Sequence, residues 1–126
     1  MVQFELVSPE RTLASTEAEG VTIPGQMGDM TAMAGHIPQL STLRPGFVVL
    51  IGGEGTRYFV TGGFAEVGPE TVSVLAEEAV MAEEATPDYL ATKIEQAERQ
   101  LDEAAEDRKL LLGQRVNDLR ALAAQL

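Results

Sequence analysis

Residues 2 to about 79 carry the pattern of a β-rich domain. Apolar and polar residues alternate in short segments, and Gly and Pro separate these segments from one another. The arrangement predicts an antiparallel sandwich or barrel. The clearest strands are expected at residues 2–6, 21–23, 47–51, 57–61 and 71–76, the last of which closes the set.

Two details refine this prediction. The segment 47–51 is apolar throughout, which is typical of a strand that is buried on both faces. The Gly-rich segment 52–55 predicts a hairpin turn, Gly62-Gly63 a bulge or tight bend, and residues 68–70 another turn.

The pattern changes after residue 79. Gly and aromatic residues become rare, and the good helix formers Ala, Glu, Leu, Gln and Arg take over. Thr86 is placed to cap a helix that starts at Pro87, with Asp88 favourably placed in its first turn. The chain is therefore expected to divide into a β domain, residues 1–85, and a helical segment, residues 86–126.

The helical segment contains two apolar stripes with the three- and four-residue spacing of one helix face. They are formed by Leu90, Ile94, Ala97, Leu101 and Ala104, and by Leu112, Val116, Leu119, Ala123 and Leu126. No Gly or Pro lies between the stripes. One continuous rod and a hairpin bent near residues 106–109 are both compatible with this pattern.

Charge and composition exclude several classes of function. The net charge of −11 repels nucleic acids and anionic lipids. Residues 1–85 hold 12 acidic and 3 basic side chains, and residues 86–126 hold 8 and 6, so the helical segment is the part suited to an acidic partner.

No Cys is present, which excludes a disulfide framework. No apolar run approaches the roughly 20 residues of a membrane span, and the first residues do not resemble an export or import leader.

Residues with catalytic chemistry are few. His36 is the only histidine and lacks the partners of a general base or a metal ligand, so packing or an interface is the expected role. The glycine pairs lack the Lys of a phosphate-binding loop. The acidic pairs Glu77-Glu78 and Glu83-Glu84 match no metal-binding loop. We expect no catalytic residue, metal site or cofactor of the chain's own.

Two sequence blocks resemble the ATP synthase epsilon subunit family. The first reads VTIPGQMGD at residues 21–29, GHIPQL at 35–40 and LRPG at 43–46. The second reads FVTGGFAEV at 59–67 and VSVLAE at 72–77. The blocks cover most of residues 2–79 in the order and spacing of the family, whereas the last third resembles it only in being helical, Ala-rich and charged.

The resemblance implies a ten-stranded antiparallel β-sandwich followed by a mobile helical hairpin. It also implies a non-catalytic rotor subunit of the central stalk, peripheral at the cytoplasmic face of the bacterial inner membrane. A stiff sandwich would couple the c-ring and the gamma subunit to the catalytic head. Whether the helices also inhibit ATP hydrolysis is left open, as are the coupling ion and the resting position of the hairpin.

The resemblance also assigns contact residues in the β domain. The loop of Met27, Gly28, Asp29 and Met30 is expected against the c-ring, where Asp29 would pair with a basic side chain and the two Met would supply adaptable apolar contact. The turn of His36, Ile37 and Pro38, with Ser41 nearby, is expected against the gamma subunit.

Two further sites are expected in the helices. Arg108, Lys109, Arg115 and Arg120 would reach acidic residues of the beta subunit in an extended state, and a solvated helix face explains them equally well. Some family members bind ATP on the first helix. Here the nearest match is Ile94, Glu95 and Arg99, with Glu in place of Asp and the Arg displaced by one position, which weighs against nucleotide binding.

The expected stability of the helical segment suits a switch. Burial of each large apolar residue of the stripes stabilises the folded state by at most roughly 1.5 to 3 kcal/mol. The loss of conformational entropy costs on the order of 1.5 kcal/mol for every residue that becomes ordered. We therefore expect the helices to detach without unfolding of the sandwich. The alternative is a free-standing β-sandwich that binds proteins and oligomerises through its helix, and an enzyme is the weaker rival.

Overall fold

The computed structural model describes residues 1–52 and 55–125 of the chain. The chain forms two compact units, a β unit, Met1–Ala82, and a helical unit, Glu83–Leu126. Gly53 and Glu54 of the predicted hairpin turn, and Leu126 of the second apolar stripe, lie outside the described residues.

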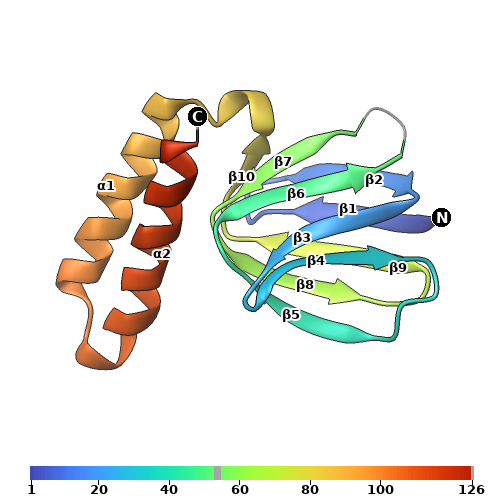
Figure 1. The fold of residues 1–126 in the computed structure, drawn as a ribbon, viewed down its shortest axis with the longest axis horizontal. Coiled ribbons are helices and arrows are strands. Elements are labelled where there is room, and N and C mark those ends of the chain that lie inside the picture. The colour runs from blue at the N-terminus through green and yellow to red at the C-terminus, as the bar shows by residue number, and fades with distance from the viewer. Residues whose placement is uncertain (53–54, 126) are drawn as a thin grey trace. The chain divides into compact units, whose positions relative to one another are not determined.

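The β unit contains ten strands that form two layers (Figure 1). They are β1 Val2–Val7, β2 Thr12–Ala18, β3 Gly20–Gly25, β4 Gly28–Met33, β5 Gln39–Leu43, β6 Gly46–Ile51, β7 Arg57–Val60, β8 Gly63–Val67, β9 Thr71–Ala76 and β10 Ala79–Met81. The resemblance implied ten strands, and this expectation is confirmed.

The strands follow the order β10-β7-β6-β3-β5-β8-β9-β1-β2, and β4 pairs with β3. The hydrogen-bonded sheet continues from one layer to the other between β3 and β5, which share the single pair Gly25 and Leu43. Among the described strands, β1 and β9 form the only parallel pair. An alternating strand pattern does not reveal pairing direction, so this departure from a fully antiparallel sheet was not predictable from it.

Alternation along the strands fills the space between the layers. In β1, Val2, Phe4 and Leu6 are buried and the residues between them are exposed. The rings of Phe4 in one layer and Tyr58 in the other lie 6.1 Å apart. The inner faces of both layers therefore share one apolar core, which makes the β unit a stiff body.

Two details of the predicted strands are wrong. In β6, Val48 and Leu50 are buried, but Phe47, Val49 and Ile51 are only half-buried, so the strand is not buried on both faces. Nor does β9 close the set, because the short strand β10 follows it and pairs with β7.

Gly62 and Gly63 make the tight bend between β7 and β8, as the sequence predicts. Both have positive φ, 147° and 135°. A Cβ atom on Gly63 would lie 2.1 Å from the carbonyl oxygen of Leu75, on the neighbouring strand β9. Only glycine permits this close approach of two backbones.

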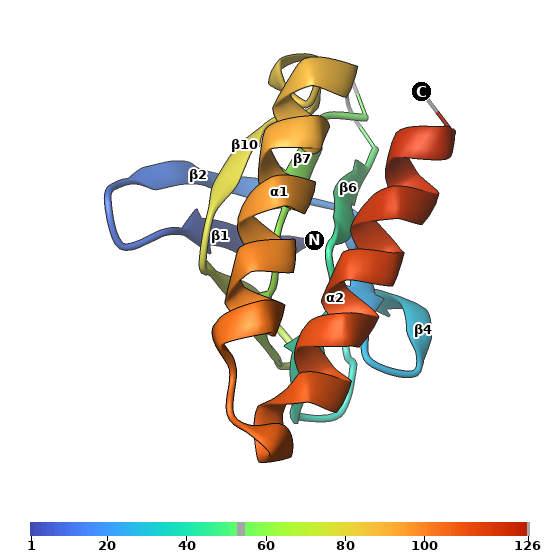
Figure 2. The ribbon, with the colours of Figure 1, turned by 90° about the vertical axis from the view of Figure 1, so that its left-hand side faces the viewer.

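A short 3₁₀ turn, Ala82–Glu84, leads into the helical unit. The described part of that unit contains two helices, α1 Pro87–Glu103 and α2 Glu106–Ala124, that lie side by side (Figure 2). Thr86 caps α1 by accepting a hydrogen bond from the amide of Tyr89, which confirms the predicted start at Pro87. Five residues of the two stripes are buried, namely Leu90 and Ala97 of α1 and Leu112, Val116 and Leu119 of α2.

The bend between the helices falls at Ala104-Ala105, slightly before the predicted position. Both residues have an extended backbone, and Glu106 already begins α2. The acidic residues Glu106 and Asp107 fill the first turn of α2, where the positive end of the helix dipole favours them. This preference places the break ahead of Glu106.

Candidate functional site

The loop of Met27, Gly28, Asp29 and Met30 is a tight turn between β3 and β4, closed by the pair Gly25 and Gly28. Gly28 has a φ of 123°, a conformation that suits glycine. Met27 at the tip is fully exposed, and Asp29 is exposed beside it. Met30, in contrast, packs against the core and anchors the turn. Of the two methionines in this turn, Met27 is thus the one that is available for an apolar contact outside the chain.

His36 lies in the loop that connects β4 to β5. Its amide donates to the carbonyl of Met33 at 3.1 Å, and its Nδ1 lies 2.7 Å from the carbonyl oxygen of Ile37. Nδ1 therefore carries the proton in this arrangement and donates to that carbonyl. The half-buried ring thus holds the turn, and it leaves Ile37 exposed by 78% and Pro38 exposed.

The two loops lie at opposite ends of the β unit, because β4 runs from one to the other (Figure 1). A strand of this length spans roughly 20 Å at about 3.3 Å per residue. The predicted c-ring and gamma residues are therefore not brought together into one site. They suit two partners that approach from different directions.

Ser41 faces the interior of the β unit. It is paired with the buried Ala65 of β8, whereas its neighbours Leu40 and Thr42 lie on the outer face of β5. Leu40 is exposed by 69%, and Ser41 only in part. Ser41 therefore supports the strand, and Leu40 presents the surface.

The outer face of this layer carries a row of apolar residues that the sequence analysis did not identify. The row crosses three neighbouring strands in direct register and consists of Val7, Leu75 and Phe64, and Thr42 of β5 continues the register at its end. Phe64 is exposed by 51% and Leu75 by 55%. We call Val7, Leu75 and Phe64 the apolar row. An exposed aromatic and aliphatic cluster on a strongly acidic chain is typical of a surface that a partner covers.

A more acidic row runs beside the apolar row. It lies two residues away from the apolar row on each strand and consists of Glu5, Ser73, Glu66 and Leu40. The signal in the sequence is the run Val74-Leu75, where two consecutive apolar residues break the alternation. Without the register of β8 and β9, nothing links Leu75 to Phe64.

The predicted nucleotide residues are not gathered at a site. Ile94 is half-buried in the helical unit, whereas Glu95 and Arg99 are exposed. Ile94 and Arg99 are five residues apart, which places them about 140° apart around α1 at about 100° per residue. Their arrangement is that of one ordinary amphipathic helix.

The four basic residues of α2 lie on two sides of its buried stripe. Arg120 Nη2 donates to Glu98 Oε2 of α1 at 2.9 Å, and Lys109 lies 3.4 Å from Glu106. Arg108 is exposed, and Arg115 is half-buried. Arg120 and Lys109 are thus held by acidic residues of the helical unit itself.

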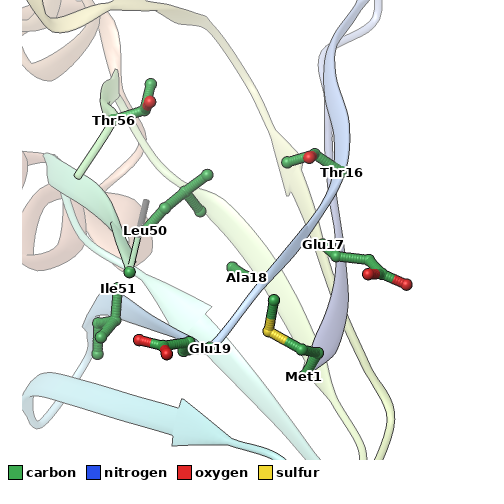
Figure 3. A pocket seen from close by; sticks show the side chains of 9 residues that line it. Met1, Thr16, Glu17, Ala18, Glu19, Leu50, Ile51 and Thr56 are labelled. Carbon is green, nitrogen blue, oxygen red and sulfur yellow. The ribbon is translucent and has the colours of Figure 1, made fainter. Parts of the chain in front are cut away.

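The β unit also has a pocket of about 290 Å³ at one end (Figure 3). It is lined by Met1, Thr16, Glu17, Ala18, Glu19, Leu50, Ile51, Gly52 and Thr56. Glu17 and Glu19 point in different directions (Figure 3). The pocket therefore lacks converging polar groups of the kind that orient a substrate.

No group of three or more His, Cys, Asp or Glu is placed to hold a metal ion in residues 1–52 and 55–125. Within the same residues, no helix is long and apolar enough to cross a membrane.

Comparison with known proteins shows to which family the chain belongs. The model of the family described as ATP synthase, Delta/Epsilon chain, beta-sandwich domain matches residues 1–82. The chain is also 48% identical to the ATP synthase epsilon chain of Cereibacter sphaeroides, over 98% of this chain and 94% of that one. The chain belongs to the ATP synthase epsilon chain family. The epsilon chain of Rhodobacter capsulatus is 42% identical over 99% of this chain and 96% of its own length.

Solved structures agree with membership of the epsilon chain family. A chain of the Euglena gracilis mitochondrial ATP synthase, in a structure of OSCP, F1 and the c-ring, is similar with a TM-score of 0.73 and 26% identity. The match covers 98% of this chain and 80% of that one, and so includes both units. A chain of the Tetrahymena thermophila central stalk and c-ring shares the fold, with a TM-score of 0.56 and 16% identity over 67% of this chain and 69% of that one.

Proposed function

We infer that this chain is a non-catalytic subunit of the central stalk of an ATP synthase. The observation that carries this inference, beyond family membership, is the apolar row. Phe64 and Leu75 are each about half exposed, side by side on the outer face of a rigid β unit. Covering them with a partner removes apolar area from water at about 25 cal/mol per Å².

We propose that the gamma subunit covers the apolar row. Leu40 and Ile37 extend the same apolar character toward the loop that holds His36. The adjacent acidic residues Glu5 and Glu66 favour basic residues at the edge of the partner's surface. This proposal keeps the expected contacts at Ile37 and Pro38 and adds the residues of the row.

We propose that the turn between β3 and β4 rests on the c-ring. Met27 offers a flexible, fully exposed thioether, and Asp29 offers a carboxylate beside it. Because the turn and the loop of His36 are separated by the length of β4, the β unit would connect two rotor parts. In a bacterial cell the chain would then lie at the cytoplasmic face of the inner membrane.

We further propose that the helical unit moves separately from the β unit and regulates the catalytic head. Leu110 and Leu111 of α2 are exposed, so α2 has apolar surface besides the stripe that faces α1. Arg108, Lys109, Arg115 and Arg120 would then face acidic residues of the head. A chain that ends at Ala85, assembled into the enzyme, should hydrolyse ATP faster than the full chain; an equal rate would limit the helices to coupling.

Assembly of the full-length chain with the rest of the enzyme tests the inferred function. The double variant Phe64→Ser, Leu75→Ser should keep its fold, because both side chains lie on the outer face, and should no longer co-purify with the complex. Leu110→Ser, which removes a still more exposed apolar residue from α2, is the control and should co-purify normally. Normal assembly of the double variant would remove the apolar row from the interface.

A further inference from the structure

The strand β2 ends the sheet and presents a free backbone edge. Among the described residues it pairs only with β1. The pairing is regular from Val2 and Ala18 to Leu6 and Ala14, and the one irregularity lies beyond Leu6. Natural edge strands are usually blocked by Pro, charged side chains, a bulge or short length. Residues 14–18 have one of these features, the carboxylate of Glu17, which excludes acidic partners but not basic ones.

A hydrogen bond in β1 shows which backbone groups of β2 face outward. The amide of Gln3 donates to the carbonyl of Glu70 at 2.8 Å, so the backbone of Gln3 points away from β2. Its cross-strand partner is Glu17. In such an antiparallel pair, the N–H and C=O of Glu17 point away from β1 as well. Because direction alternates along a strand, the same groups of Ser15 also point to the open edge.

The side chains beside this edge alternate between two environments. Thr16 and Ala18 lie opposite Phe4 and Val2 and therefore face the interior, where they line the 290 Å³ pocket with Leu50 (Figure 3). Phe4 is fully buried, yet Thr16 is exposed, so the two layers are open at this edge. Glu17 points away from the pocket, and Glu19 lies at its border.

We propose that β2 is a docking edge for an extended segment of a partner protein in which aliphatic and basic residues alternate. The segment would add to the sheet as a further strand, bonded to the backbones of Ser15 and Glu17. Residues opposite Thr16 and Ala18 would place branched aliphatic side chains in the pocket. The residue opposite Glu17 would lie on the outer face, where Lys or Arg complements that carboxylate. This surface is separate from the turn at Met27 and from the apolar row, and the proposal does not depend on the proposed function.

A short synthetic peptide tests the proposal on the isolated full-length chain. The probe is Thr-Val-Lys-Val-Lys-Val-Thr, and the readout is amide hydrogen exchange followed by NMR. At a peptide concentration ten times its Kd, exchange at Ser15 and Glu17 should slow about tenfold, because only the free protein exchanges at these sites. The amide of Thr16, which faces β1, should change little.

Two matched controls distinguish strand addition from charge attraction. The same peptide with N-methylated lysines keeps its charge but lacks the amides that would pair with Glu17, and it should give no protection. Ser15→Pro should keep the fold, since Pro is tolerated on an edge strand where the N–H faces outward, and should abolish protection by the unmodified peptide. The proposal is overturned if about 1 mM peptide protects neither amide, or if Ser15→Pro or the methylated peptide leaves protection unchanged.

Discussion

The guanidinium of Arg120 in α2 donates a hydrogen bond of 2.9 Å to the carboxylate of Glu98 in α1. The two residues are 22 positions apart, and their contact links the helices of the hairpin beside the buried residues Leu112, Val116 and Leu119. An Arg120 that binds the catalytic head must first leave Glu98.

Removal of this contact should have a small effect on stability. Both side chains are about half exposed, so water screens the pair, and Glu98→Gln or Arg120→Gln should lower the free energy of unfolding by less than about 1 kcal/mol. Urea unfolding of both single variants and the double variant gives the interaction energy. An interaction energy well above 1 kcal/mol would mean that the hairpin is held by charge more than by its apolar stripe.

Gly113→Ala should stabilise the helical unit. Gly113 lies inside α2, and a Cβ atom at this position would have no heavy atom within 4 Å. Alanine should therefore raise the free energy of unfolding by about 0.5 to 1 kcal/mol, through helix propensity and a less flexible unfolded chain. The reverse change at exposed Ala121 should cost a similar amount. Urea unfolding followed by far-ultraviolet circular dichroism measures both, and a destabilised Gly113→Ala would show that the site is not open.

Gly63→Ala should destabilise the β unit severely. The added Cβ would lie 2.1 Å from the carbonyl oxygen of Leu75, and the φ of 135° is itself strained for alanine. We expect a loss of roughly 3 kcal/mol or more in thermal unfolding, in the range of strained and overpacked sites. Gly68→Ala is the control, because its nearest contact would be an ordinary 3.6 Å, and it should cost less than about 1 kcal/mol. Equal losses in the two variants would contradict the close approach of β8 and β9.

Thr86→Ala should weaken the start of α1. The hydroxyl of Thr86 accepts from the amide of Tyr89 at 3.2 Å, and loss of such a cap typically costs about 1 kcal/mol. Thr86→Ser keeps the acceptor and should be nearly neutral. Hydrogen exchange at the amide of Tyr89 reports the effect locally; unchanged exchange in Thr86→Ala would show that the cap contributes nothing.

The features best predicted from the sequence are those that depend on neighbouring residues only. Alternation in β1, the Thr86 cap and the Gly62-Gly63 bend depend on neighbouring residues only, and all three are present. The bend between the helices was placed slightly late. No Gly or Pro marks it, and the extended Ala104-Ala105 is not distinctive in sequence.

Features that depend on pairing between distant segments were not predictable from the pattern. The parallel pair of β1 and β9 joins segments from near the beginning and near the end of the amino-acid sequence of the β unit. The apolar row exists only because Val7, Leu75 and Phe64 fall in register across three strands. Likewise, Met30 and Ser41 read as surface residues beside Met27 and Pro38, and only the fold shows that they face inward.

The central claim is that the β unit connects two different rotor parts, one at the turn of Met27 and one at the surface that extends from the apolar row to the loop of His36. Photo-crosslinking in the assembled enzyme tests it most directly, with a photoreactive phenylalanine analogue placed at Met27 in one preparation and at Phe64 in another. The account predicts that Met27 links to a subunit of the c-ring and Phe64 to the gamma subunit, with both variants fully assembled. If both positions link to the same subunit, or neither links to any, the β unit does not bridge the rotor in the way described.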